Sequence, residues 1–312
     1  MKSTRWPIWL VAAAIAIVGF FWGIYRFADP EQLEIDSSVR QTVAGEFASL
    51  SDGYTHYQLD GPVNGRVVVL AAGFSVPYYI WDPTFESLAG AGFRVLRYDY
   101  YGRGYSDRPH ISYNDDLYIR QLDQLLHVLH IAEPVDLVGI SFGASVITNF
   151  ADKYPERVRS LVYFDPSIRR PHGTTLLADF PSVWSYLTVL FDERYWATSQ
   201  LDDFFHPERF PDWPTRYREQ LRYRGFRLAR LSEFVSNAEV DQGDQLKRVG
   251  EHPRPVLVIW GKEDQTVAFE ESEWFMTTLP HASLLAVESA AHLPQWEQPE
   301  VVHPQLIRFL RE

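Results

Sequence analysis

The feature that most constrains the fold is a serine between two glycines, placed where one sequence pattern changes into another. Residues 135–150 read VDLVGISFGASVITNF, and the continuously apolar run gives way to a helix-like run around Ser141. A buried strand that runs straight into a helix needs a tight turn, and glycine relieves steric crowding there. The serine is therefore either part of the turn chemistry or a nucleophile held on a strained elbow, as in the Gly-x-Ser-x-Gly motif.

Apolar runs of strand length alternate with helix-like segments along most of the chain. The strand-like runs cover residues 54–59, 66–72, 93–99, 135–140, 158–165, 255–260 and 283–287, and the helix-like segments cover 115–131, 142–153, 268–279 and 299–311. The middle runs are continuously apolar, as strands buried on both faces of a sheet are. The alternation predicts an α/β fold with a mostly parallel, doubly wound sheet, in which ligands bind beyond the carboxyl ends of the strands.

The strand pattern stops between about residues 167 and 250, where aromatic residues and arginine are dense. Because this stretch begins directly after the C-terminal end of a strand, we predict an inserted, mainly helical lid at about 167–250. Its aromatic side chains either pack against the sheet or line an apolar substrate pocket. The candidate substrate contacts are Tyr78, Trp81 and Trp184.

The N-terminus carries a long apolar segment. Residues 6–27 contain no charge before Arg26, with tryptophan at one end and tryptophan and tyrosine at the other. About 20 apolar residues are needed to cross the hydrocarbon core, and amphipathic rings favour the headgroup layer. A cleaved signal peptide is the alternative, but its apolar region is shorter and ends in small residues. We therefore expect an uncleaved transmembrane anchor at 6–27, a polar tether at 28–50 and a catalytic domain at 51–312.

The charges on either side of this segment predict its orientation. Lys2 and Arg5 precede the predicted anchor, and acidic residues follow Arg26. The positive-inside rule then predicts a single-pass membrane protein with a cytoplasmic N-terminus and a catalytic domain outside the cytoplasm. The membrane is one predicted partner of this chain, and a small-molecule or lipid ester substrate is the other.

Composition excludes several other classes of protein. The net charge of -12 argues against a nucleic-acid partner, because binding to a phosphate backbone requires a basic face. The chain has no cysteine, which excludes disulfides, thiolate metal sites and a cysteine nucleophile. The sequence contains no cluster of histidine and carboxylate residues with metal-ligand spacing, so no metal or other cofactor is expected.

A nucleophilic serine requires partners elsewhere in the chain. Its hydroxyl reacts poorly unless a base accepts its proton and a third group orients that base. On a sheet of this kind the three side chains come from the ends of different strands, in the chain order serine, acid, histidine. Asp264 and His292 follow the last two strand-like runs in this order. Asp165, which ends an earlier run, is the alternative acid.

Four segments resemble motifs of the serine hydrolases in the α/β-hydrolase superfamily. They are GISFG at 139–143, GKED at 261–264, AAHLPQWEQPE at 290–300 and DYYGRGYS at 99–106. The likeness runs from about residue 51 to 312 and extends to membrane-anchored, monoacylglycerol-lipase-like enzymes. It implies acyl-enzyme chemistry with Ser141 as nucleophile, His292 as base and Asp264 as acid. An acid at the strand end that Asp165 occupies also occurs in this superfamily.

Attack on a carbonyl generates an oxyanion, which needs preorganised hydrogen-bond donors. The backbone N–H of Phe142 directly follows the nucleophile at the start of a helix and is one candidate donor. The resemblance places the second donor at the backbone N–H of Phe74. Many relatives have His-Gly before this position, where the present chain has Ala72-Gly73.

The predicted function is hydrolysis of an apolar or lipid-derived carboxylic ester, similar to a monoacylglycerol, through a Ser-His-Asp triad and an acyl-enzyme. A hydrolase of carbon–carbon bonds in diketone-like compounds uses the same triad, and so does an acyltransferase whose lid excludes water. A non-catalytic, membrane-anchored binding protein on this fold is the remaining alternative. Serine at position 141 counts against a haloalkane dehalogenase or an epoxide hydrolase, which use aspartate there.

Overall fold

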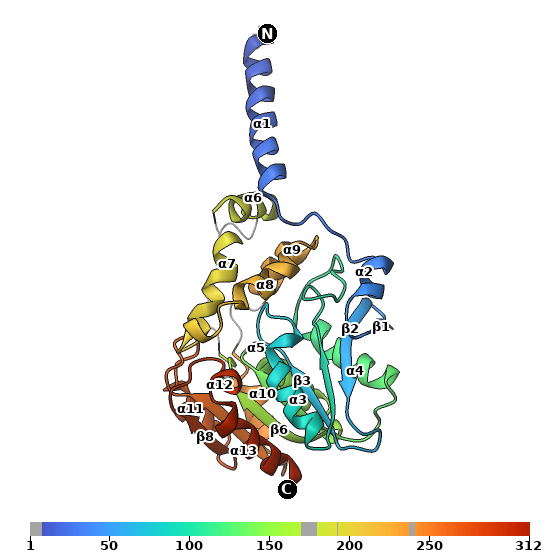
Figure 1. Ribbon diagram of the computed structural model, residues 1–312, viewed down its shortest axis with the longest axis vertical. Coiled ribbons are helices and arrows are strands. Elements are labelled where there is room, and N and C mark those ends of the chain that lie inside the picture. Colours follow the sequence, from blue (N-terminus) through green and yellow to red (C-terminus); the bar gives the residue numbers. More distant parts are fainter. Residues whose placement is uncertain (1–7, 170–179, 192, 237–240) are drawn as a thin grey trace.

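The computed structural model describes residues 8–169, 180–191, 193–236 and 241–312 (Figure 1). Its centre is an eight-stranded sheet in the order β1-β2-β4-β3-β5-β6-β7-β8. The strands are β1 (Glu46–Leu50), β2 (Gly53–Asp60), β3 (Val67–Ala71), β4 (Arg94–Tyr98), β5 (Val135–Ile140), β6 (Val158–Phe164), β7 (Val256–Gly261) and β8 (Ser283–Val287). β1, β2 and β4 pair antiparallel, and every pair from β4–β3 to β7–β8 is parallel. The predicted α/β fold with a mostly parallel sheet is confirmed.

The direction of strand order reverses at β3 and β5, which are neighbours in the sheet although β4 lies between them in the chain. Such a switch point leaves a crevice beyond the carboxyl ends of the strands, where ligands bind in doubly wound sheets. Every residue of β5 and of β7 is buried. That burial explains why both strands are continuously apolar in sequence instead of alternating between apolar and polar residues.

Two groups of helices flank the sheet. In one group, α3 (Asp82–Gly90) contacts α13 (Pro299–Arg311), and the short α12 (Pro294–Glu297) contacts both. The second group is α4 (Asp115–Val128), α5 (Phe142–Lys153), α10 (Gly243–Gly250) and α11 (Glu271–Thr278), each in contact with the next. α4 begins after Asn114, whose side chain accepts the backbone N–H of Leu117 and so caps the helix.

A helical insertion lies between β6 and β7, as predicted, and we call it the lid. It holds α6 (Pro181–Phe191), α7 (Glu193–Ser199), α8 (Trp213–Leu221) and α9 (Phe226–Ser236), with short 3-10 turns at Gln200–Asp203 and Pro207–Arg209. A bridge between Arg169 and Asp241 closes its base. The prediction extended the lid to 250, but α10 packs against α5 and belongs to the helices that flank the sheet. Residues 170–179, 192 and 237–240 of the predicted lid lie outside the described residues.

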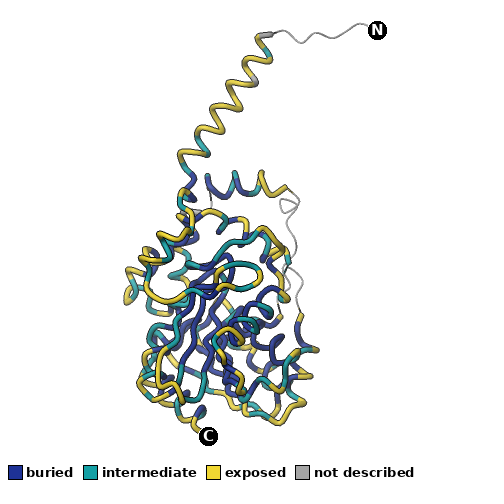
Figure 2. The backbone as a smooth tube through the Cα atoms, turned by 90° about the vertical axis from the view of Figure 1, so that its right-hand side faces the viewer, coloured by how far each residue is buried: buried dark blue, intermediate teal, exposed yellow. Residues whose placement is uncertain are grey.

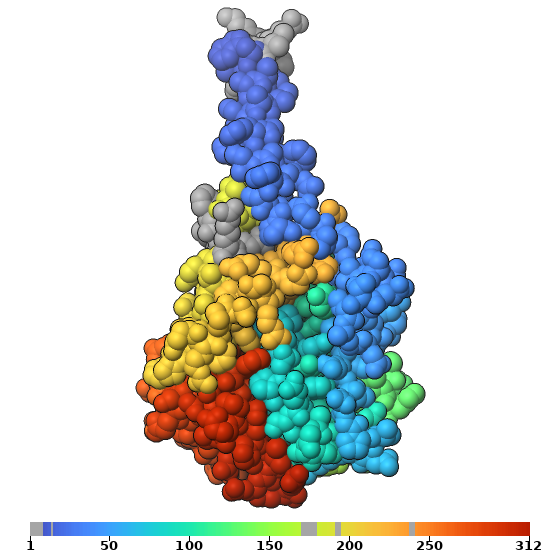
Figure 3. Space-filling model, in the orientation of Figure 1, coloured from blue at the N-terminus to red at the C-terminus, as the bar shows by residue number. Residues whose placement is uncertain are grey.

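α1 (Ile8–Ala28) projects as one long helix from the lid end of the molecule (Figure 1, Figure 3). Residues Trp9–Ala28 have a mean hydropathy of 1.9, and the protein buries none of their most apolar stretch. Figure 2 shows this exposed helix rising beside α6. By length and composition α1 could cross a membrane, a test that a signal sequence also passes. Residues 6 and 7 of the predicted anchor lie outside the described residues.

The segment predicted as a polar tether, 28–50, is instead structured. α2 (Ser37–Thr42) begins after Asp36, whose carboxylate accepts two backbone N–H bonds. β1 then forms the edge strand of the sheet. Before α2, Leu33 forms a bridge with Tyr223 of the lid. The polar residues of this segment therefore serve as caps and pairing partners. In the sequence alone, the same polar composition looks like that of a linker.

Candidate active site

Ser141 occupies a sharp turn between the end of β5 and the start of α5. Its backbone has φ 52° and ψ −115°, a sparsely populated conformation for a residue with a side chain, which costs on the order of 1–3 kcal/mol. Three backbone hydrogen bonds hold the turn. The Ser141 N–H donates to the Phe164 carbonyl (2.9 Å), and the Ser141 carbonyl accepts from Ala144 (3.0 Å) and Ser167 (3.2 Å). The structure thus has the strained strand-to-helix elbow that the sequence predicts.

The close packing of α5 against the sheet explains the two glycines beside Ser141. A Cβ added at Gly143 would fall on the carbonyl oxygens of Ala71 and Ala72, at the end of β3. A Cβ added at Gly139 would lie 2.5 Å from the Gly143 carbonyl oxygen. Only glycine fits at these two positions, because α5 begins in direct contact with β3 and β5.

The predicted acid and base meet beyond the ends of β7 and β8. His292 Nδ1 lies 2.7 Å from Asp264 Oδ2, and both side chains are buried. The other carboxylate oxygen, Oδ1, accepts the backbone N–H groups of Thr266 (2.7 Å) and Val267 (3.0 Å). The lid also holds the histidine, because the His292 backbone N–H donates to the carbonyl of Asp203 (3.0 Å). Asp264 is thereby fixed as the hydrogen-bond acceptor that orients the imidazole ring.

The surroundings of His292 strongly perturb its basicity. Burial by itself lowers the pKa of His292, but the charge of Asp264, its hydrogen bond and the charge of Asp203 outweigh burial and raise the pKa to about 9. A group that has to accept the proton of a serine must be neutral beforehand. The base form of His292 therefore becomes dominant only on the alkaline side of neutrality.

Asp165, the alternative acid, lies within the same cluster but plays a different part. Its polar atoms lie within 4.8 Å of those of Asp264 and His292. Its carboxyl accepts the backbone N–H of Gly261 (2.9 Å), whereas the hydrogen bond of the imidazole goes to Asp264. Burial and then the negative charge of Asp264 raise the pKa of Asp165 well above its usual range. Burial therefore favours the neutral form of Asp165 beside the acid, and the Nδ1 of His292 is already used in the hydrogen bond to Asp264.

Ser141 and this cluster are joined through the segment after β6. Phe164 and Ser167 both bond to the backbone of Ser141, and Asp165 lies between them in the chain. Asp165 has φ 41° and is completely buried. The same short segment thus fixes the serine elbow on one side and touches the acid and the histidine on the other.

The loop that carries the predicted second oxyanion donor lies against the serine. A Cβ at Gly73 would be 3.7 Å from the Ser141 Cβ. The next residue, Phe74, packs edge-to-face on Phe142, with ring centroids 6.5 Å apart. Ser75 follows with φ 64° and is buried. The structure therefore brings both predicted donor residues to the elbow, although the chain has Ala72 where many relatives have histidine.

Lid helix α8 holds this loop in place, a role that the sequence did not reveal. The Tyr217 hydroxyl lies 2.9 Å from Ser75 Oγ, and Gln220 Nε2 donates to the Ser75 carbonyl (2.7 Å). Gln220 Oε1 also accepts the backbone N–H of Gly104 (3.2 Å), in the turn that follows β4. Both polar side chains are buried, so their hydrogen bonds are costly to leave unmade. Buried polar residues on an otherwise apolar helix face are the only signal that could have indicated this role.

The three predicted substrate contacts do not gather at the serine. Trp81 is completely buried and packs on Phe164 at 5.3 Å, so it is a core residue. Tyr78 stacks on His56 at 4.9 Å and lines a separate cavity of about 630 Å³, whose lining includes no member of the predicted triad. Trp184 lies in α6 and packs against Trp196 at 6.2 Å. The prediction that these aromatic residues contact the substrate is therefore wrong for Trp81, which belongs to the core, and Tyr78 lines a cavity apart from the predicted triad.

Two arginines approach the ring of Phe74 from the lid side. The guanidinium carbons of Arg103 and Arg230 lie 5.4 Å and 5.5 Å from its centroid. Arg103 forms an ion pair with Glu233, and both of these side chains are completely buried. Arg230 also stacks over Trp196 at 3.9 Å. Positive charge therefore lies close to the loop that faces Ser141.

Comparisons with known proteins agree with this geometry. The chain matches the alpha/beta hydrolase family over residues 68–305. It is 26% identical over 294 residues to a 2-hydroxy-6-oxononadienedioate/2-hydroxy-6-oxononatrienedioate hydrolase of Cupriavidus pinatubonensis, which covers 88% of this chain and 97% of the relative. It is 26% identical over 276 residues to a 2-hydroxy-6-oxo-6-phenylhexa-2,4-dienoate hydrolase of Comamonas testosteroni, covering 84% and 93%.

The fold also matches a solved enzyme over nearly its whole length. The structure of a meta-cleavage product hydrolase from Pseudomonas fluorescens superposes with a TM-score of 0.70 at 25% sequence identity. The match covers 86% of this chain and 97% of that enzyme.

Proposed function

Because this chain belongs to the alpha/beta hydrolase family, we propose that it is a serine hydrolase in which Ser141 is the nucleophile, His292 the base and Asp264 the acid that orients the base. The observation that carries this assignment is the buried hydrogen bond between Asp264 and His292. Ser167, which donates to the carbonyl of Ser141, lies two residues after Asp165, a neighbour of this pair. A strained serine and a histidine with a strongly perturbed pKa are typical of a nucleophile and its base.

The proposed reaction passes through an acyl-enzyme. Ser141 Oγ attacks the substrate carbonyl while His292 takes its proton, and the backbone N–H groups of Phe74 and Phe142 bind the oxyanion. His292 then gives the proton to the leaving group and activates a water molecule, which releases the acid and restores the serine. In total one water is consumed: its hydroxyl joins the acyl carbon, and its hydrogen joins the leaving group.

Our leading proposal for the substrate is a 2-hydroxy-6-oxo-dienoate, in which hydrolysis breaks a carbon–carbon bond. The names of the two relatives describe acids that contain a hydroxyl and a ketone but no ester. A hydrolase that acts on such a compound has to cleave a bond between the ketone carbon and its neighbour. The 2-hydroxydiene first has to tautomerise to its 2-oxo form, which moves the enol proton to the carbon next to the reacting ketone. The carbon fragment can then leave as a conjugated dienolate, and it takes the proton that His292 holds. Hydrolysis of a carbon–carbon bond is one of the alternatives that the sequence predicts, and the names of the relatives favour it over hydrolysis of a lipid ester.

Charge near the elbow supports this choice. Substrates of this class carry one or two carboxylates, which a cation in the substrate site would bind. Arg230 stands 5.5 Å from the ring of Phe74, next to the proposed oxyanion donor. An arginine is well suited to a carboxylate because its planar fork can form two parallel hydrogen bonds. An uncharged monoacylglycerol has no carboxylate that such a cation could bind.

An apolar or lipid-derived ester is the second candidate, and α1 is the observation that favours it. A helix with the length and composition of a membrane span would hold the site beside a store of lipid. Leu228 in α9, Phe180 before α6 and Val183 in α6 expose much of their surface at the same end of the molecule. These features fit an apolar substrate, whereas the comparisons fit the dienoate.

A direct comparison of substrates decides between the two candidates. Full-length protein in detergent is assayed with 2-hydroxy-6-oxo-6-phenylhexa-2,4-dienoate, monooleoylglycerol and 4-nitrophenyl butyrate, with Ser141→Ala as control. We expect benzoate to form from the dienoate, with a kcat/KM at least about 100-fold above either ester. The reverse order supports the ester. Transfer to glycerol in preference to water identifies an acyltransferase, and a failure of Ser141 to react with a fluorophosphonate supports a non-catalytic binding protein.

We also propose that α1 anchors the protein in a membrane, with the N-terminus on the cytoplasmic side. Its exposed, uncharged surface has no counterpart in the described part of the protein that could cover it. The basic residues at positions 2 and 5 favour the cytoplasm. Extraction of membranes at alkaline pH tests the anchoring, and protection of the domain from added protease tests the orientation. Release of the chain into the soluble fraction contradicts the anchor.

A further inference from the structure

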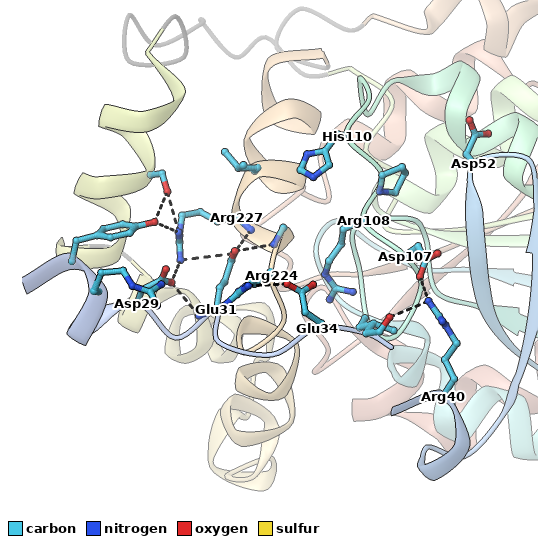
Figure 4. A pocket seen from close by; sticks show the side chains of 17 residues that line it. Asp29, Glu31, Glu34, Arg40, Asp52, Asp107, Arg108, His110, Arg224 and Arg227 are labelled. Carbon is cyan, nitrogen blue, oxygen red and sulfur yellow. Dashed lines mark hydrogen bonds and ion pairs between the residues drawn. The ribbon is translucent and has the colours of Figure 1, made fainter. Parts of the chain in front are cut away.

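A polar cavity of about 670 Å³ lies at the foot of α1, and none of the three catalytic residues lines it (Figure 4). Its walls come from the end of α1, the segment before α2, the turn after β4 and the start of α9. Five arginines and five carboxylates are among its lining residues. The distribution of these charges shows what the cavity can bind.

Every carboxylate in the cavity already has a cation. In the centre, Arg227 lies 2.6 Å from Asp29 and 3.8 Å from Glu31, and Glu31 also accepts the backbone N–H groups of Gly225 and Arg227. Figure 4 shows Arg227 between these two acids. The remaining pairs are Arg224–Glu34 (3.0 Å), Arg40–Asp107 (2.7 Å) and Arg120–Asp52 (2.8 Å), the last with a cation outside the cavity.

Two arginines in the lining, Arg108 and Arg26, have no carboxylate partner among the described residues. Arg108 donates to the backbone carbonyls of Ser106 (2.8 Å) and Gly104 (2.9 Å), and its guanidinium carbon lies 5.7 Å from the centroid of the Tyr223 ring. Its Nε is buried and has no hydrogen-bond acceptor in the described part of the chain. Burial lowers the pKa of Arg108 to about 10, so the side chain is still a cation at neutral pH. Arg26 lies exposed in the last turn of α1.

Glu31 and Asp99 act on the Arg108 cation only from beyond ion-pair distance, and a half-buried cation of this kind is stabilised when an anion joins it. Arg26 brings one wall of the cavity to the last turn of α1, which lies in the headgroup layer if α1 crosses a membrane. Arginine forks match the oxygen atoms of phosphate in geometry as well as in charge. Leu228, which also lines the cavity, is 43% exposed and offers an apolar contact beside the two cations.

We propose that this cavity binds the phosphate group of a membrane phospholipid, with Arg108 and Arg26 as its contacts. The inference rests on the proposed membrane anchor and does not depend on which substrate Ser141 attacks. A bound phospholipid would fill the space between α1, the turn after β4 and the lid. It would therefore hold the lid at a constant height above the bilayer.

Native mass spectrometry of the full-length protein tests the site. The protein is reconstituted in nanodiscs of phosphatidylethanolamine, phosphatidylglycerol and phosphatidylcholine, and the lipid that remains bound after release is counted. We expect one phospholipid per chain, with occupancy reduced at least about fivefold in Arg108→Gln and in Arg26→Gln. Arg26 is exposed, so its variant can be interpreted even if Arg108→Gln folds poorly. Arg248→Gln is the matched control, because Arg248 is exposed, lies in α10 and pairs with Asp152 (2.6 Å).

Three outcomes overturn the proposal. One is that no phospholipid stays bound, and another is that the two cavity variants retain as much lipid as Arg248→Gln. The third is that inorganic phosphate, titrated against the protein in detergent, binds in an Arg108-dependent way as tightly as a short-chain phospholipid does. That result would make the cavity a site for soluble phosphate. Alkaline extraction reports separately on the anchor, so failure of the anchor and failure of the lipid site are distinguishable.

Discussion

His292 Nδ1 and Asp264 Oδ2 lie 2.7 Å apart in a buried pair, and the second oxygen of Asp264 is held by two backbone N–H groups. This arrangement assigns a different task to each nitrogen of the imidazole. Nδ1 carries the proton that binds the carboxylate, so Nε2 is the atom that can exchange a proton with a serine. Because the acid and the histidine follow neighbouring parallel strands, the sheet itself sets the distance between them.

Asp264→Asn and Asp165→Asn make the same chemical change at two adjacent carboxyl groups. We expect Asp264→Asn to lower kcat about 10³- to 10⁴-fold, because an amide cannot hold the imidazole in the correct tautomer. Asp165 is a neutral neighbour without a hydrogen bond to the ring, so its substitution should cost less than about tenfold. The rate of Ser141 labelling by a fluorophosphonate measures both variants without knowledge of the substrate. A larger loss in Asp165→Asn would assign the acid to the earlier strand.

Activity should rise with pH through the neutral range. The pKa of His292 is raised to about 9, and only the neutral imidazole can accept the serine proton. Below that pKa, kcat/KM or the labelling rate should fall about tenfold for each pH unit. Asp264→Asn removes the largest stabilising charge, so its profile should shift to lower pH. A wild-type profile that is flat between pH 6 and 9, measured with protein shown to be folded, contradicts the raised pKa.

Patterns that depend on local sequence were predicted well. β5 occupies the six residues expected of it, because a strand buried on both faces is continuously apolar and its end is marked by the glycine turn. The order serine, acid, histidine predicted that Asp264 and His292 lie together, because each follows a strand and the ends of parallel strands lie at one edge of the sheet. Asp264 and His292 could therefore be placed together without any knowledge of the packing.

Features that depend on tertiary contacts could not be predicted in this way. Trp81 is a core residue, yet a tryptophan in a loop after a strand looks the same in sequence whether it faces a pocket or the interior. The segment before α2 looks like a linker because its pairing with the lid, through Leu33 and Tyr223, joins residues far apart in the chain. Gln220 supports the loop at Ser75 through a hydrogen bond between residues far apart in the chain, so its role could not be predicted either.

Gly143→Ala should destabilise the protein through a steric clash. The added methyl group would fall on the carbonyl oxygens at the end of β3, and neither backbone can move without breaking the elbow. Overpacking of this kind costs about 1–3 kcal/mol in the free energy of unfolding. Gly90→Ala is the control, because a Cβ there meets nothing within 4 Å, and its effect should stay within about 0.5 kcal/mol or be stabilising. Denaturant unfolding in detergent compares the two variants, and equal stabilities would mean that α5 does not pack on β3 as described.

The ion pairs at the foot of α1 should differ greatly in their contribution to stability. Arg227 is almost completely buried and pairs with Asp29, while Arg224 pairs with Glu34 at the exposed surface. Arg227→Met leaves two buried carboxylates without a cation, and we expect a loss of about 3–5 kcal/mol. Arg224→Met removes an exposed pair and should cost at most about 1 kcal/mol.

The reason for this difference is that Arg227 joins three separate elements. Besides Asp29, it donates to the Tyr25 hydroxyl (3.1 Å) at the end of α1 and to Ser185 Oγ (3.0 Å) in α6. Loss of this cation should therefore free the lid from α1 before the sheet unfolds, since β5 to β8 make none of these contacts. Hydrogen exchange should show faster opening of α6 and α9 in Arg227→Met and unchanged rates in β5. Equal hydrogen-exchange rates in the lid of both arginine variants would mean that Arg227 stabilises the protein no more than a surface ion pair does. Other contacts, such as the stacked rings of Tyr25 and Tyr186, would then hold α1 and the lid together.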